Sequence, residues 1–457
     1  MIDPAGILLP ATARSIPLSL IRAADWKRTN SALPAGTKAW ADANGFGAGA
    51  GKVLFVPDRK GGISAVLAGT SDTDPFSSGQ VCRLLPEGTY ALVGDVELAS
   101  LVALGWCLEA YAFGMYRNVE AKTARLVCPK GVDREAVLRS ARATFLVRDL
   151  VNTPASDMGP AELEAVSRAI AGPFKAKLTV ITGKTLEREF PMIHAVGRAS
   201  PRAPRLIDFS WGSSRAPKVT LVGKGVCFDT GGLDIKPASG MLLMKKDMGG
   251  AANVLGLAQM IMAAKLPVRL RVLIPAVENS IAGNAFRPGD VLRSRKGITV
   301  EIGNTDAEGR LVLGDALALA DADKPDLLID MATLTGAARV ALGPDIAPFY
   351  TDDDALARDI ERAALQENDP VWRLPFWRPY TRLFESSIAD MNNSGDSGFA
   401  GSITAALFLK RFVENAKTYV HFDVFAWTPS ARAGRPKGGE AQAIRALFAV
   451  ISKRFAK

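Results

Sequence analysis

The chain is poor in the residues that build nitrogen- and sulfur-rich metal sites. Its 457 residues include only two histidines, His194 and His421, and four cysteines, none in a C-x-x-C pair. Cysteines scattered in this way argue against a disulfide framework and against a zinc ribbon. Any metal site in this protein must therefore be built mainly from ligands other than imidazole.

The sequence also lacks long apolar runs and concentrated charge. No stretch reaches the ~18 consecutive apolar residues that a membrane span needs, and prolines at positions 4, 10 and 17 make the N-terminus untypical of a signal peptide. Lysine and arginine number 56 against 47 acidic residues, which gives a net charge of +9 with no basic run. This modest surplus permits an acidic partner but does not require one. We expect a cytoplasmic protein with neither a membrane nor a nucleic-acid partner.

What remains is ordinary globular composition, with 48% apolar and 23% charged residues. At about 150 residues per domain, the length predicts two to three domains. Residues 1–130 alternate short apolar runs with turns and include an amphipathic helical stretch from Asp95 to about Tyr116, which indicates a small N-terminal α/β domain. A connecting helix capped by Asp133, with its linker, would occupy residues 131–160, and a larger domain residues 161–457.

From residue 160 onward, apolar strands alternate with helices. The pattern predicts strands at 219–225, 268–279 and 326–334, and helices at 249–265 and 309–323. Such alternation is typical of a central, mostly parallel sheet covered by helices. The expected fold class is therefore α/β, with a small N-terminal α/β domain followed by a larger C-terminal α/β domain.

Three features that could be mistaken for functional motifs have simpler interpretations. The glycine-rich segment 45–52 lacks the first glycine and the Ser or Thr of a Walker loop, and it predicts a flexible surface turn. Cys227 has no histidine near it in sequence and is interpreted as a buried structural thiol. His194 and His421 lie in apolar surroundings, which favours core or interface positions over metal ligation.

Four acidic residues stand where predicted strands and helices meet. Asp229 follows an apolar strand, whereas Asp247, Asp306 and Glu308 precede apolar helices. Sites in open α/β folds form at the carboxyl ends of strands, where clustered carboxylates need cations to offset their desolvation. Helix capping would explain one such acid. Four of them among glycine-rich loops predict a divalent-metal site, in which an uncharged lysine amine could be a further ligand.

These acids lie in segments that resemble the leucine (cytosol) aminopeptidase family. NTDAEGRL at 304–311 resembles the family's signature octapeptide. VGKGVCFDTGGLDIKP at 222–237 and MKKDMGGAAN at 244–253 resemble its two preceding metal-site segments, in the same order and spacing. The resemblance covers residues 145–430, with further similar segments at 148–160, 330–337 and 389–409.

The resemblance implies a dinuclear metallo-aminopeptidase whose catalytic domain is residues 161–457. Two divalent ions, manganese or zinc, would be bound by Lys224, Asp229, Asp247, Asp306 and Glu308. Asp229 and Glu308 would bridge the two ions. Lys236 would hydrogen-bond the substrate carbonyl, and Arg310, with the backbone of Leu334, would hold a bicarbonate ion that acts as general base. The pocket for the first side chain would be lined by Met244, Thr333 and Gly336.

The expected function is removal of the N-terminal residue of peptides by a hydroxide held between the two ions. Peptides with a free N-terminal amine would be the substrates, and the family resemblance also implies a homohexamer. Two alternatives stay open at this point. One is a non-catalytic basic scaffold or DNA-binding protein, supported only by the net charge of +9. The other is a different dinuclear hydrolase, such as an amidase.

Overall fold

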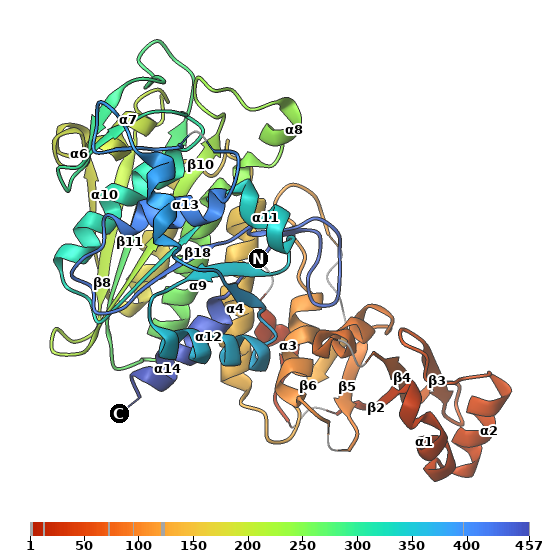
Figure 1. The fold of residues 1–457 in the computed structure, drawn as a ribbon. Coiled ribbons are helices and arrows are strands. Elements are labelled where there is room, and N and C mark those ends of the chain that lie inside the picture. Colours follow the sequence, from red (N-terminus) through yellow and green to blue (C-terminus); the bar gives the residue numbers. More distant parts are fainter. Residues whose placement is uncertain are drawn as a thin grey trace. The chain divides into compact units, whose positions relative to one another are not determined.

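The computed structural model describes residues 3–11, 14–71, 74–94, 96–119, 124–395 and 397–456, and the chain packs into two compact units (Figure 1). One unit is Met1–Phe145 with Ser430–Lys437, and the other is Leu146–Pro429 with Gly438–Lys457. The division falls inside helix α4 (Arg134–Asn152), whose start is capped by the Asp133 carboxylate, as the sequence predicts. The domain limits expected at residues 130 and 160 stay a prediction, because compactness alone does not define an independently folding domain.

The smaller unit is built on a six-stranded sheet in the order β1-β6-β5-β2-β4-β3. All neighbouring strands are parallel except the antiparallel pair β3 and β4. Its strands are β1 (Leu8–Leu9), β2 (Ile16–Arg22), β3 (Val53–Pro57), β4 (Ile63–Thr70), β5 (Gly88–Leu92) and β6 (Ala124–Val127). Its helices besides the start of α4 are α1 (Trp26–Ala32), α2 (Ala35–Ala43) and α3 (Ala99–Glu109).

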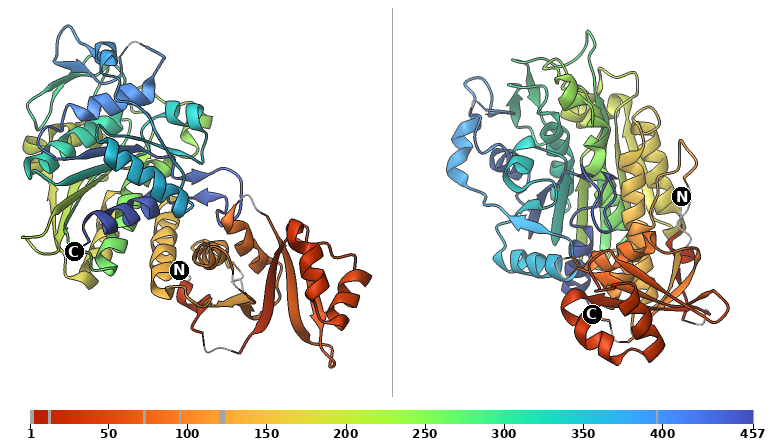
Figure 2. Two further views of the ribbon diagram at one scale, coloured as in Figure 1. Left: turned by 60° about the horizontal axis from the view of Figure 1, so that its bottom comes forward. Right: turned by 90° about the vertical axis from the view of Figure 1, so that its right-hand side faces the viewer.

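Apolar side chains alternate along the strands of this sheet, so that each face carries its own core. In the left view of Figure 2, helices α1 and α2 lie on one side of this sheet and α3 on the other. On β4, Val66 and Ala68 belong to the core that includes α3. Leu67, between them, belongs to the second core, against which residues of α1 and α2 pack. This alternation follows from the two-residue period of a strand, and it confirms the α/β character expected of the N-terminal part.

Two expectations for the smaller unit were wrong in detail. The helix expected from Asp95 to about Tyr116 spans only Ala99–Glu109, and it is buried nearly all round rather than amphipathic; Asp95 itself lies outside the described residues. A helix that is apolar on every side belongs inside a core. Segment 45–52 is a loop, but Phe46 and Ala48 are buried in the second core, so it is not a free surface turn.

The larger unit contains a nine-stranded sheet in the order β16-β15-β18-β14-β9-β11-β8-β7, with β10 pairing to β11. Its strands are β7 (Lys177–Thr182), β8 (Arg205–Trp211), β9 (Lys218–Gly223), β10 (Gly225–Asp229), β11 (Arg269–Asn279), β14 (Leu327–Ala332), β15 (Ala347–Tyr350), β16 (Val371–Arg373) and β18 (Tyr419–Asp423). The pairs β7–β8, β8–β11 and β15–β18 are antiparallel and the others parallel. The expected mostly parallel sheet is therefore confirmed.

Helices cover both faces of this sheet. The α-helices of the larger unit after α4 are α5 (Pro160–Ala171), α6 (Gly183–Glu189), α7 (Pro191–Gly197), α8 (Ala238–Met241), α9 (Gly249–Ala263), α10 (Glu308–Ala322), α11 (Gly336–Leu342), α12 (Asp354–Gln366), α13 (Gly401–Lys410) and α14 (Ile444–Arg454), of which the short α8 has no buried residue. Short strands outside the sheet are β12 (Val291–Arg293), β13 (Thr299–Glu301), β17 (Met391–Asn392), β19 (Trp427–Thr428) and β20 (Gly438–Gly439). The helices and strands predicted between 219 and 334 are all present, with ends shifted by one or two residues.

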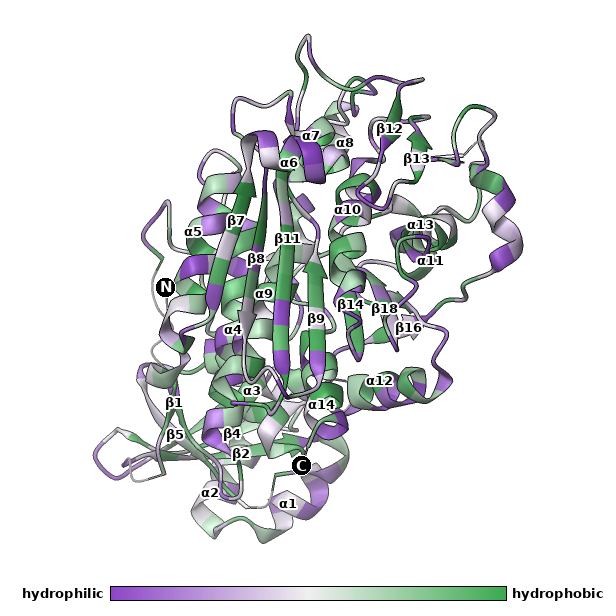
Figure 3. Cartoon of the chain, turned by 90° about the vertical axis from the view of Figure 1, so that its left-hand side faces the viewer, coloured by the Kyte–Doolittle hydropathy of each residue, from purple (hydrophilic) through white to green (hydrophobic). Residues whose placement is uncertain are grey.

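The central strands are buried on both sides, as their hydrophobic colouring in Figure 3 indicates. Val222 of β9 packs in a core with α7, α10 and α13, while its neighbour Leu221, which points to the opposite face, is equally buried. The opposite face of β9, β11 and β14 carries α9. Within the described ranges, we find no helix with the length and apolar character needed to traverse a bilayer.

Candidate metal centre

The carboxyl ends of parallel strands bring the predicted residues to one edge of the large sheet. Lys224 follows β9, Asp229 ends β10 and Thr333 follows β14. The remaining acids come from the starts of helices, with Asp247 just before α9 and Glu308 opening α10. One cavity of about 310 Å³ is lined by all eleven candidate residues: Lys224, Asp229, Lys236, Met244, Asp247, Asp306, Glu308, Arg310, Thr333, Leu334 and Gly336.

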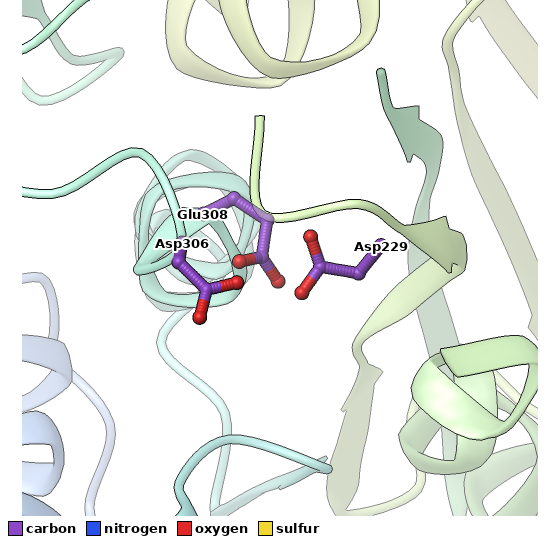
Figure 4. A group of neighbouring side chains, drawn as sticks. All are labelled: Asp229, Asp306 and Glu308. Carbon is purple, nitrogen blue, oxygen red and sulfur yellow. The ribbon is translucent and has the colours of Figure 1, made fainter. Parts of the chain in front are cut away.

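Three carboxylates in this cavity point toward one another (Figure 4). One oxygen each of Asp229, Asp306 and Glu308 lies within 4.8 Å of the others. Burial, followed by the nearby Asp229 charge, raises the pKa of Glu308 to about 8 and that of Asp306 to about 6. Carboxylates this close repel each other when both are ionised. The arrangement therefore favours a bound cation.

Two lysine ammonium groups each contact two of the acids. Lys224 Nζ lies 2.8 Å from Asp247 Oδ2 and 2.9 Å from Glu308 Oε1. Lys236 Nζ lies 2.9 Å from Asp229 Oδ2 and also contacts Asp306 Oδ1. Burial acts to lower the pKa of both lysines, but the adjacent carboxylates outweigh it and raise both pKa values above the ordinary range. Both side chains are therefore cationic beside these carboxylates.

Two glycines near the acids lie where other atoms of the protein leave little room for a side chain. A Cβ on Gly309 would lie 2.6 Å from Lys224 Nζ, so a larger residue there would push this lysine away from its carboxylate partners. Gly231 has a φ of +90°, and a Cβ there would lie 2.3 Å from the carbonyl oxygen of Asp234. Both contacts are far below normal packing distance. The glycine-rich segments that the sequence places beside Asp229 and Glu308 thus serve the geometry of the cluster.

Arg310 is a half-buried cation in the same cavity wall, and its Nε atom is buried. Its Nη1 donates a hydrogen bond to the carbonyl oxygen of Asn393, whereas its Nε has no acceptor among the described residues. Burial lowers the pKa of Arg310 to about 10, which still leaves it charged at neutral pH. A guanidinium with an unused buried donor is a suitable site for a small anion.

The donor set fits divalent metal. Asp247 Oδ2, Asp306 Oδ1 and Glu308 Oε1 are buried and accept no hydrogen bond of good geometry from the described residues, although a lysine ammonium lies near each. Buried acceptors without such bonds are uncommon. A cation would satisfy all three, and carboxylate oxygens with a single amine suit ions such as Mn²⁺ or Zn²⁺.

Sequence reasoning missed several residues that shape the cavity. Asn279, the last residue of β11, donates from Nδ2 to Asp229 Oδ1 at 2.9 Å. Asp423, the last residue of β18, accepts hydrogen bonds from the backbone N–H groups of Leu334 and Thr335 at 3.0 and 3.1 Å. Their positions at strand ends were a usable signal, because Asp229 was identified in the same way.

Lys246, inside the recognised MKKD segment, was also overlooked. Its side chain is buried in the cavity wall, and its Nζ lies 3.6 Å from Asp247 Oδ1. Burial lowers the pKa of Lys246 to about 8. The sequence gives no sign of this, since adjacent lysines usually indicate a solvated surface.

The cysteine and histidines set aside from the sequence lie outside the cavity. Cys227 is buried, and burial raises the pKa of its thiol well above the ordinary value, in keeping with a structural role. His421 is buried and its Nδ1 lies 2.7 Å from Asp330 Oδ1. His194 lies 3.9 Å from Glu187, measured from Nε2 to Oε1. None of the three lines the metal-centre cavity.

Models of known protein families and curated relatives match most of the chain. The model of the cytosol aminopeptidase family catalytic domain matches residues 145–448, and that of the M17 aminopeptidase N-terminal domain matches residues 16–129. A probable cytosol aminopeptidase of Roseiflexus castenholzii is 43% identical over 317 residues, which cover 68% of this chain and 64% of that relative. The aligned region thus spans just under two thirds of the relative's length.

Solved structures resemble the chain over nearly its whole length. The crystal structure of a cytosol aminopeptidase from Coxiella burnetii has a TM-score of 0.94 at 47% identity, covering 97% of this chain and 98% of that one. The bottromycin maturation enzyme BotP in complex with Mn has a TM-score of 0.85 at 31% identity, covering 97% of this chain and all of the other (100%). The chain therefore belongs to the cytosol aminopeptidase family, a family of metal-dependent aminopeptidases.

Proposed function

We propose that this chain is a dinuclear aminopeptidase that releases the first residue of peptides with a free N-terminal amine. The observation that carries the proposal is the convergence of Asp229, Asp306 and Glu308, whose carboxylate oxygens lie within 4.8 Å of one another in a buried cavity. Asp229 and Glu308 would bridge two ions, with Asp306 completing one site and Lys224 and Asp247 the other. A lysine ligand must be uncharged, so Lys224 would lose its proton when an ion binds.

When bound, the two ions supply Lewis acidity for the scissile carbonyl, a water of lowered pKa and an anchor for the free α-amine. The BotP structure in complex with Mn supports manganese as one of the candidate metals, beside zinc.

Lys236 would act on the carbonyl oxygen of the substrate. Negative charge grows on that oxygen as the carbonyl carbon becomes tetrahedral, so a hydrogen bond from the Lys236 ammonium stabilises the transition state more than the bound substrate. The two carboxylates that Lys236 contacts, Asp229 and Asp306, keep its pKa above the ordinary value and hence keep it protonated.

Arg310 and the backbone of Leu334 would hold a bicarbonate ion, which supplies general-base chemistry when bound. The buried Nε of Arg310 has no acceptor in the part of the chain that the structure describes, and Asp423 accepts a hydrogen bond from the Leu334 backbone N–H at 3.0 Å. Met244, Thr333 and Gly336 would line the pocket for the first side chain. A homohexamer and a cytoplasmic location complete the proposal, the latter following the names of the relatives.

The experiment is to strip the protein with a chelator, reload it with Mn²⁺ or Zn²⁺, and assay Leu-p-nitroanilide. We expect activity only after reloading, with two ions per chain by elemental analysis. Glu308→Ala should lose both activity and bound metal, whereas Glu187→Gln, at an exposed carboxylate outside the cavity, should lose neither. Full activity in Glu308→Ala would refute the proposal.

A further inference from the structure

Two basic side chains in the wall of the metal-centre cavity have no part in the mechanism above. Lys246 Nζ lies 5.6 Å from the centroid of the Phe425 ring, and Arg339 Cζ lies 4.6 Å from the same centroid. Lys246, Arg339 and Phe425 all line the cavity. Two cations thus lie close to one aromatic ring in the cavity wall.

The protein gives these two cations little counter-charge. Lys224 and Lys236 each contact two carboxylates within hydrogen-bonding distance, but Lys246 has one acidic neighbour, Asp247, at 3.6 Å. Arg339 forms no ion pair with any residue in the described ranges. Buried or partly buried charge without a close partner is costly, and an aromatic face offsets only part of that cost.

Lys246 is not needed to neutralise Asp247. Lys224 Nζ already lies 2.8 Å from Asp247 Oδ2, and Thr333 Oγ1 donates a hydrogen bond to Asp247 Oδ1 at 2.9 Å. Across the whole cavity, five basic side chains face four acidic ones. Any divalent ions at the four acids would increase the excess of positive charge. The cavity therefore suits a substrate that brings a negative charge with it.

The place of these cations indicates which part of a substrate they meet. In the proposed function, the ions anchor the α-amine of the peptide, and we assign this role to the ion that Lys224 and Asp247 would hold. The first side chain and the α-amine are attached to the same carbon. The side chain must therefore lie against the cavity wall next to Asp247, where Lys246 and Arg339 lie. We infer that peptides with an acidic first residue are the preferred substrates, with Lys246 and Arg339 binding the side-chain carboxylate.

This inference rests on the proposed function, and it concerns specificity rather than the reaction itself. Its test compares Glu- with Gln-p-nitroanilide, because the two side chains have the same shape and differ in charge. We expect the Mn²⁺-loaded enzyme to favour Glu by at least about tenfold in kcat/KM, the effect of one well-placed ion pair. Lys246→Met should reduce the Glu-to-Gln ratio by about tenfold.

The matched control is Lys245→Met, which changes the neighbouring lysine. Lys245 Nζ donates a hydrogen bond to the Asn152 carbonyl oxygen and lies outside the cavity lining, so the ratio should stay as in the wild type. Arg339→Gln provides a second variant at a less buried position, should Lys246→Met fail to fold. Calorimetric binding of L-glutamate and L-glutamine gives a readout independent of turnover, and Lys246→Met should weaken only glutamate binding.

The outcomes separate the two proposals. Hydrolysis of both substrates with no preference for Glu, or with a preference that neither variant changes, overturns the inference and leaves the proposed function standing. Absence of hydrolysis with Lys246-dependent glutamate binding overturns the proposed function and, with it, the substrate preference, and leaves only carboxylate binding by Lys246. Absence of both hydrolysis and glutamate preference overturns both.

Discussion

Thr305 and Asp234 tie together the two loops that carry the acids of the metal centre. The Thr305 N–H donates to Asp234 Oδ2 at 2.7 Å, and the Asp234 N–H donates to Thr305 Oγ1 at 2.8 Å. One loop follows Asp229 at the end of β10, and the other leads into Glu308 at the start of α10. The two predicted metal-ligand segments are thus held in register by residues that bind no metal themselves.

Replacing Thr305 by valine keeps the shape of the side chain and removes the hydroxyl. The hydroxyl accepts from the Asp234 N–H at 2.8 Å and donates to the Gly231 carbonyl oxygen at 2.6 Å, so the two loops lose both of these hydrogen bonds and the acids are held less firmly. We expect metal affinity to fall by about tenfold to a hundredfold, the usual effect of losing a residue that supports metal ligands. A chelator competition titration measures this. Thr179→Val, on the exposed side of β7, is the control, and equal affinities in the two variants would contradict the prediction.

Arg310→Met removes the cation proposed to hold bicarbonate. We expect kcat to fall by about a hundredfold, in line with the loss of a general base, and added bicarbonate to stimulate the wild type but not the variant. Arg310→Lys, which keeps a charge without the guanidinium donors, should recover part of the stimulation. Steady-state assays over a bicarbonate series in CO₂-free buffer measure this, and undiminished stimulation of Arg310→Met would exclude the role.

Asp315→Ala should destabilise the protein without touching the metal centre. The buried Asp315 carboxylate accepts hydrogen bonds from the backbone N–H groups of Met192, Ile193 and Arg295 at 2.9, 3.3 and 2.7 Å. Alanine leaves two buried donors and one part-buried donor without this acceptor, which costs about 3 kcal/mol or more. Urea denaturation measures the loss. Asp315→Asn retains one acceptor oxygen and should lose less, and equal stability of all three proteins would contradict this account.

The buried pair of His421 and Asp330 predicts a pH-dependent stability. Burial acts to lower the pKa of His421, but the Asp330 carboxylate, 2.7 Å away, outweighs it and raises that pKa above the ordinary value of 6.5. The folded protein thus binds this proton more tightly than the unfolded chain. The protonated His421–Asp330 pair therefore contributes to the free energy of unfolding. This contribution is fully present below pH 6.5 and is lost as pH rises through the folded-state pKa of His421.

Denaturation midpoints between pH 6 and 9 test this linkage. His421→Gln should lower the free energy of unfolding by about 3 kcal/mol at the acidic end, where it breaks a buried ion pair, and by less at the alkaline end. The difference between the two proteins should therefore shrink as pH rises. A difference that is constant or grows with pH would show that His421 is not the titrating group.

Much of the larger unit could be read from the sequence. Apolar runs of strand length alternating with helical patterns predicted β9, β11 and β14 with α9 and α10, because burial on both faces leaves a strong local signal. The acids Asp229 and Glu308 stood at predicted ends of such elements. In a parallel sheet covered by helices, the carboxyl ends of the strands and the starts of the helices lie at one edge, so the convergence of Asp229 and Glu308 could be predicted from the local pattern.

Other features had no local signal. Lys246 is buried in a cavity wall although it sits beside another lysine in sequence, and Phe46 is buried within a segment that resembles a turn. Residues 430–437 pack with the smaller unit although nearly three hundred residues separate them from Phe145. Local composition cannot report such contacts, because they depend on segments that are distant along the chain.

The amino-acid sequence by itself determined the ligand chemistry of this protein: oxygen-rich acids, two lysines and an arginine, with hardly any histidine to compete. The tertiary structure alone decided which basic side chains have two close carboxylate partners and which do not. Lys224 and Lys236 meet carboxylates, whereas Lys246 and Arg339 meet an aromatic ring. The reason is physical: the spacing of residues along a chain fixes which groups are present, but burial and distance in three dimensions fix the charge each of them experiences.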